Sequence, residues 1–86
     1  MQPTIGRIVH YTLNDTDANL IQQRRTTDGT IANTTSEGQT YPATVVRTFG
    51  GEAANLQVHL DGPDTYWATS RTPGEGPGHW AWPARV

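Results

Sequence analysis

The fold class is decided by the stretch Asn55-Leu56-Gln57-Val58-His59-Leu60-Asp61-Gly62-Pro63-Asp64. Its first six positions alternate polar and aliphatic residues, which is the period of a strand that is buried on one face only. The last four positions combine Asp, Gly and Pro, and this chemistry is typical of a tight turn. The stretch therefore predicts a half-buried strand that ends in a hairpin.

Four further segments on either side of this stretch also have strand character. Each is enriched in β-branched and aromatic residues and is bounded by residues that favour turns. These segments are residues 6–13, 41–49, 65–70 and 79–82. With the first stretch they predict five short strands at hairpin spacing.

One segment has the features of a helix instead. Asn14 stands three residues before Asp17, which is a capping signature, and Arg24-Arg25 would fall in the last turn, where positive charge suits the helix dipole. We therefore expect a helix of about three turns over residues 15–25. The Thr, Asn, Gly and Ser residues of positions 26–39 predict a surface loop after it.

Together these elements predict a mainly β fold, a small five-stranded SH3-like partly open barrel with one short helix inserted between strands 1 and 2. We expect a single domain over residues 1–86, with the helix and loop insertion at about 14–40. The chain has no Cys and only 34% apolar residues, so no disulfide supports its thin core. A homo-oligomer, either a dimer or a tetramer, is the expected source of further stability.

The charge pattern bears on the partners. A net charge of −2 argues against a protein that binds duplex nucleic acid, because such proteins collect basic residues. All six cations are Arg, whose planar guanidinium suits phosphate or carboxylate. The first eleven residues contain no apolar run long enough for a signal or a membrane span, so we expect a cytoplasmic protein without a membrane partner.

Five short motifs along the chain are distinctive as a set. They are Gly6–Tyr11, Arg24-Arg25-Thr26 at the helix end, Tyr41-Pro42 followed by Val45-Val46-Arg47, Asp61-Gly62 leading to Tyr66–Ser70, and Pro77–Pro83. This set covers most of the chain and resembles a family of small, mostly uncharacterised proteins encoded by bacteriophages and prophages. Its members usually read Trp-His-Trp-Pro-Glu near the end, where this chain has Ala81 and Ala84 in place of His and Glu.

The resemblance implies a phage accessory protein in the cytoplasm of the infected bacterial host, and no established enzymatic activity. By analogy with other phage proteins, the expected function is a non-enzymatic anti-defence sponge that sequesters a cyclic nucleotide or cyclic ADP-ribose signal of host immunity, as in CBASS or Thoeris. The alternative is a protein-interaction module that binds a host or virion protein. A small enzyme that hydrolyses the signal is a third, weaker interpretation.

The candidate ligand-binding residues are guanidinium donors for an anion and flat rings that stack on a base. They are Arg24, Arg25, Arg47, Arg71, Trp67, Trp80, Trp82 and His79. Two structural explanations stay open. The arginines at the helix end also offset the helix dipole, and the tryptophans also suit the core of a small barrel.

The sequence predicts no catalytic residue, no metal ligand and no cofactor. Its three histidines lack close ligand spacing, and its two serines do not stand in a Gly-x-Ser-x-Gly setting. Gly74, Gly76 and Gly78 are interleaved with Pro73 and Pro77 and precede no helix, so they predict a loop and not a phosphate cradle.

Overall fold

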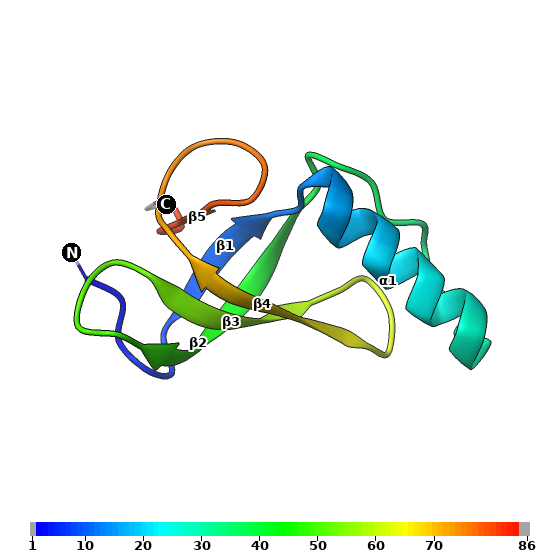
Figure 1. Ribbon diagram of the computed structural model, residues 1–86, viewed down its shortest axis with the longest axis horizontal. Coiled ribbons are helices and arrows are strands. Elements are labelled where there is room, and N and C mark those ends of the chain that lie inside the picture. Colours follow the sequence, from blue (N-terminus) through cyan, green and yellow to red (C-terminus); the bar gives the residue numbers. More distant parts are fainter. Residues whose placement is uncertain (1, 85–86) are drawn as a thin grey trace.

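The protein contains one antiparallel sheet and one helix (Figure 1). The computed structural model describes residues 2–84. Its elements are β1 (Ile8–Thr12), α1 (Asp15–Asp28), β2 (Thr40–Thr48), β3 (Ala54–His59), β4 (Thr65–Arg71) and β5 (Trp80–Ala81). The expected mainly β class, with five strands and a helix between the first two, is confirmed.

The strand order is β4-β3-β2-β1-β5. From β1 to β4, strands that follow one another along the chain pair as hairpins, and β5 pairs with the free edge of β1. The sheet is open, and a single bridge joins Pro73, just after β4, to Trp80 in β5. Two backbone hydrogen bonds accompany this bridge, from Trp80 N–H to the Thr72 carbonyl and from Gly74 N–H to the Trp80 carbonyl. The sheet therefore curls into a partly open barrel.

Helix α1 is longer than the sequence predicts and ends at Asp28 instead of about Arg25. Thr26 and Thr27 continue it, and their hydroxyls donate to the backbone carbonyls one turn earlier. Gly29 ends it in the left-handed conformation at φ 70°, and its N–H donates to the Arg25 carbonyl. The predicted capping box is present, with Asn14 and Asp17 bonding each other's backbone N–H groups.

The inner face of the sheet forms the core. Buried side chains alternate along β1, in the middle of β2 and from Leu56 to His59 in β3, as the period of two requires. Trp80 is the largest of them and is 1% exposed. The cluster comprises Val9, Tyr11, Leu13, Ile21, Ala43, Val45, Ala54, Leu56, Val58, Leu60, Ala68 and Trp80, with Tyr41, Tyr66 and Trp82 packed against it.

The opposite face of the sheet, here called the outer face, is left uncovered by α1, which lies at the end of the sheet beside the β3–β4 turn (Figure 1). Strand register places Ile8, Thr44, Gln57 and Trp67 side by side across β1, β2, β3 and β4. These side chains alternate with the buried ones. Trp67 is 58% exposed and Ile8 47%.

We expect Trp80 and Trp67 to differ sharply in their contribution to stability. Trp80→Ala leaves a cavity in the core and should lower the free energy of unfolding by about 3 to 5 kcal/mol. Trp67→Ala removes an exposed ring and should change it by no more than about 0.5 kcal/mol. Urea denaturation followed by circular dichroism measures both, and equal losses would contradict this assignment of the core.

Candidate functional site

A buried carboxylate fastens the start of α1 to the sheet. Asp17 is 0% exposed and accepts hydrogen bonds from the hydroxyls of Tyr11 on β1 and Tyr66 on β4. Arg71, at the end of β4, donates to the same carboxylate at 2.8 Å. Its guanidinium also lies 5.7 Å from the centre of the Tyr11 ring. Since a buried charge needs both a counter-ion and hydrogen bonds, these partners make the burial of Asp17 tolerable.

The two tyrosines of this cluster are held in their neutral form. Burial, together with the hydrogen bond to Asp17, raises the pKa of Tyr66 to about 12. Burial and the same carboxylate raise the pKa of Tyr11 well above its usual range. Neither phenol is therefore suited to act as a base near neutral pH, and both serve as hydrogen-bond donors.

A second ion pair fastens the other end of α1. Arg25 is almost fully buried and donates from Nε and Nη2 to the two oxygens of Asp64 in the β3–β4 turn, at 2.8 and 2.9 Å. Arg24 donates to the same carboxylate at 3.1 Å. The Arg25 hydrogen bonds lower the pKa of Asp64 to about 2, so the carboxylate is ionised over the physiological range.

The loop after α1 closes over this ion pair. Arg25 donates to the backbone carbonyl of Asn33, and the Asn33 amide donates to Asp61. A Cβ added to Gly62 would lie 2.6 Å from the Cβ of Ala32, so the turn approaches the loop too closely for any other residue without movement. The predicted surface excursion is thus tied to the β3–β4 turn by specific contacts.

The structure distributes the predicted ligand-binding residues over several places and joins only Arg71 to the β5 group, since Trp80 Nε1–H donates to the Arg71 carbonyl at 3.1 Å. Arg24 and Arg25 contact Asp64, and Arg71 contacts Asp17. Trp80, Trp82 and His79 lie around β5, where the two indoles pack edge to face at 5.6 Å and His79 Nδ1 is 3.2 Å from the Thr72 carbonyl oxygen. Arg47 and Trp67 lie on other strands. The eight residues therefore do not line one pocket.

Arg47 differs from the three arginines of the ion pairs. It lies next to a bulge in β2, and its guanidinium is 5.3 Å from the centre of the Phe49 ring. No carboxylate of residues 2–84 forms an ion pair with it. Arg7 has the same arrangement over Trp82, at 5.8 Å. Arg85 lies outside the described residues.

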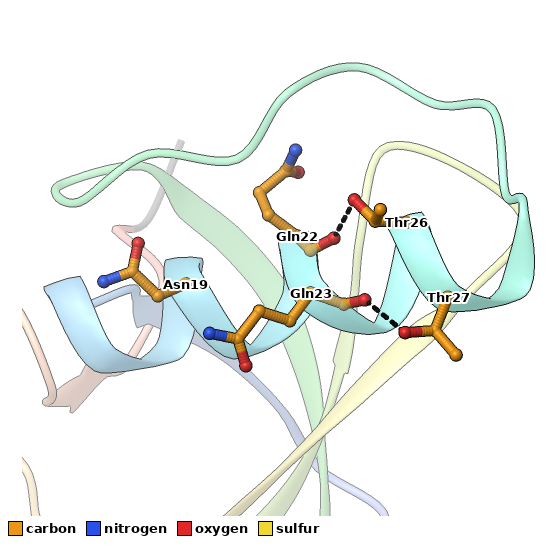
Figure 2. A pocket seen from close by; sticks show the side chains of 5 residues that line it. All are labelled: Asn19, Gln22, Gln23, Thr26 and Thr27. Carbon is orange, nitrogen blue, oxygen red and sulfur yellow. Dashed lines mark hydrogen bonds between the residues drawn. The ribbon is translucent and has the colours of Figure 1, made fainter.

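A groove of about 570 Å³ runs along α1, lined by Asn19, Gln22, Gln23, Thr26 and Thr27 (Figure 2). Its size suits a small molecule. All five residues come from one helix, however, and the buried residues of α1 lie on its other side. A ligand there would be held by a single wall, so we do not regard the groove as a binding site.

No three His, Asp or Glu side chains among the described residues lie close enough to hold a metal ion. Helix α1 is not long and apolar enough to cross a membrane. What the described part of the chain does present is the outer face of the sheet, with Trp67 and Ile8 exposed and without a carboxylate among its strand residues.

Sequence reasoning missed the outer face as a unit. The alternation in β3 did identify Gln57 and His59 as its polar side, but the partners of these residues come from register. His59 Nε2 lies 2.8 Å from the Thr44 hydroxyl, and Gln57 is paired with Trp67. The alternation of residues within each strand was therefore visible in the sequence. The order in which the strands pair was not.

The chain matches no protein-family model, and neither a curated protein nor a solved structure is significantly similar to it.

The neutral tyrosines predict a loss of stability in alkali. A phenol whose pKa is raised by folding stabilises the fold below its unfolded value of about 10, and this contribution disappears as the pH rises through the folded value. For Tyr66 the window is pH 10 to about 12. We expect urea denaturation to report a falling free energy of unfolding across that window.

Tyr66→Phe tests the cause. It removes one hydrogen bond to the buried Asp17 carboxylate and should cost about 1.5 to 3 kcal/mol at pH 7, with a shallower decline above pH 10. Thr69→Val, an exposed change on the same strand, is the control. An unchanged pH dependence in Tyr66→Phe would contradict the role assigned to this phenol.

Proposed function

We propose that this protein acts by binding another protein surface through the outer face of its sheet and has no chemistry of its own. The observation that supports the proposal is the composition of that face. Trp67, Ile8 and Val46 are large apolar residues that remain exposed there, and Phe49 follows directly after β2. Tryptophan and other aromatic residues are enriched in protein interfaces, and charged residues are depleted from their cores.

The polar residues of the outer face fit the same role. Thr44, Gln57, Thr65 and Thr69 are uncharged and can both donate and accept hydrogen bonds. A partner that covers them therefore need not strip water from a carboxylate or an ammonium group, which is the costly step in closing an interface. Together with the exposed apolar residues, they form an uncharged surface suited to a protein partner.

This proposal corresponds to the second of the three interpretations drawn from the sequence, the protein-interaction module. The resemblance to bacteriophage proteins is compatible with it, since it implies no established enzymatic activity. The expected arginine site receives less support. Arg24, Arg25 and Arg71 already neutralise Asp64 and Asp17, and an anionic ligand would have to displace these carboxylates.

Photochemical crosslinking in the producing bacterial cell tests the proposal. The photoreactive residue p-benzoylphenylalanine replaces Trp67, whose ring it approximates in size. The matched control places it at Gln23, which is exposed on α1. We expect irradiation to give a discrete protein adduct from position 67 and none from position 23. The absence of any adduct at 67, in protein that is folded by circular dichroism, would overturn the proposal.

One observation favours a second candidate function, the nucleotide sponge. The Arg47 guanidinium lies over the Phe49 ring and forms no ion pair with a carboxylate of the described residues, so it combines a phosphate donor with a ring on which a base can stack. The proposed ligand class is a cyclic dinucleotide or a cyclic ADP-ribose isomer.

Calorimetry with a panel of these nucleotides tests this candidate. Arg47→Ala should weaken binding at least tenfold, because a charge-assisted hydrogen bond contributes about 1.5 to 3 kcal/mol. Arg24→Ala, whose guanidinium contacts Asp64, is the control and should bind as the parent does. No heat of binding from the parent protein with any nucleotide would remove this candidate.

A further inference from the structure

We propose that the partner binds by adding an extended segment of its own chain to the free edge of β4, as an additional strand of the sheet. This inference rests on the function proposed above and names the way in which the partner is held. It starts from the strand order, in which β4 lies at one end of the sheet and pairs with β3. The last strand of a sheet presents unpaired backbone N–H and C=O groups along its outer side.

The hydrogen bonds between β1 and β2 determine which residues of β4 point these groups outward. Val45 N–H donates to the Arg7 carbonyl, and the Val45 carbonyl accepts from Gly6 N–H. The backbone groups of Val45 therefore point toward β1. Since this direction alternates from one residue to the next along a strand, the groups of Thr44 point toward β3, where its partner is Gln57.

The same alternation continues across β3. The backbone groups of Gln57 point toward β2, so those of Leu56 and Val58 point toward β4. Their partners on β4 are Ala68 and Tyr66. The backbone groups of Ala68 and Tyr66 are therefore bonded to β3.

The alternate residues of β4 point the other way. The N–H and C=O groups of Thr65, Trp67 and Thr69 face the free edge, and all three residues are exposed. Within residues 2–84, none of these groups forms a hydrogen bond with a loop or a turn. Ser70, at φ 52°, lies where the register with β3 shifts, so the regular part of the edge covers residues 65–69.

The opposite edge of the sheet is closed by the chain itself. β5 has two residues, and Trp80 N–H donates to the Thr72 carbonyl while Gly74 N–H donates to the Trp80 carbonyl. Pro83, which follows β5, has no N–H to offer. The contacts that curl the sheet therefore use residues beyond the end of β4 and leave residues 65–69 uncovered.

The composition of β4 also differs from that of a protected edge. Native edge strands commonly contain Lys, other charged residues or Pro, which prevent pairing with another chain. Residues 65–70 are Thr, Tyr, Trp, Ala, Thr and Ser. This edge is therefore suited to pairing with a strand of another protein.

The edge also indicates the chemistry of the added segment. Main-chain hydrogen bonds hold such a strand, and its alternate side chains give specificity. The residue paired with Trp67 lies beside the exposed indole, where an aromatic or β-branched side chain packs well. Because residues 65–70 are uncharged, we expect an uncharged segment. An added strand continues the curved sheet, so this mode does not require a flat outer face.

Amide hydrogen exchange of the isolated chain, followed by NMR, tests whether the edge is free. The N–H groups of Tyr66 and Ala68 are bonded to β3, so their protection should exceed that of Trp67 N–H by about a hundredfold or more. Equal protection of the Trp67 and Ala68 N–H groups would overturn the proposal, because it would show that the edge is already covered.

Thr65→Pro tests whether this edge holds the partner. Thr65 is the first residue of β4 and its N–H points outward, so proline there removes a free donor without breaking the pairing with β3. Thr65→Val keeps the N–H and is the matched control. Each variant is combined with p-benzoylphenylalanine at position 67. We expect the yield of the adduct in the cell to fall about tenfold or more with proline and to persist with valine.

The outcomes separate this inference from the function on which it rests. An adduct that persists in folded Thr65→Pro protein would overturn the edge proposal and leave the binding function in place. A chain with native Thr65 that gives no adduct would remove both. An adduct with twice the mass of the chain would overturn the edge proposal, because the partner would then be a second copy. Loss of the fold in Thr65→Pro would also count against it, since an outward N–H is dispensable for folding.

Discussion

The buried carboxylate of Asp17 is the constraint on which the rest of the structure depends. It caps α1 through the Asn14 N–H and accepts hydrogen bonds from the phenols of Tyr11 and Tyr66. The Arg71 guanidinium neutralises it. These partners come from β1, β4 and the helix, so one side chain fixes three elements relative to one another. A carboxylate in such surroundings is tolerated only when nearly all its partners are in place, which makes the geometry highly specific.

The need to fix α1 to the sheet through paired carboxylates also explains how the protein uses its arginines. Helix α1 buries only two apolar residues, Ala18 and Ile21, which is little for a helix of 14 residues. Ion pairs at its two ends replace the missing apolar contact. Arg71 reaches Asp17 at one end, and Arg25 reaches Asp64 at the other. Arg is suited to this task because its planar fork can bind a carboxylate with two parallel hydrogen bonds, as Arg25 does with Asp64. The absence of Lys is therefore consistent with architecture as well as with ligand binding.

Fastening the helix at the end of the sheet leaves one sheet face without a cover. In a chain of 86 residues the core is thin, and a second layer over the outer face would need residues that this chain does not have. The exposed Trp67 and Ile8 are the result. This division of the sheet, with a core on one face and an uncharged aromatic surface on the other, links the ion pairs to the proposed binding function.

The sequence by itself determined the local structure. The alternation of Leu56 and Val58 with polar residues, and the capping box of Asn14 and Asp17, depend on neighbours within a few positions, so they can be predicted without a fold. The partners of Arg25 and Trp67 could not be predicted in this way. Asp64 is 39 residues from Arg25, and Trp67 becomes part of a surface only when strand register places it in line with Ile8. Such contacts are decided by the tertiary structure, because no local periodicity encodes which strands become neighbours.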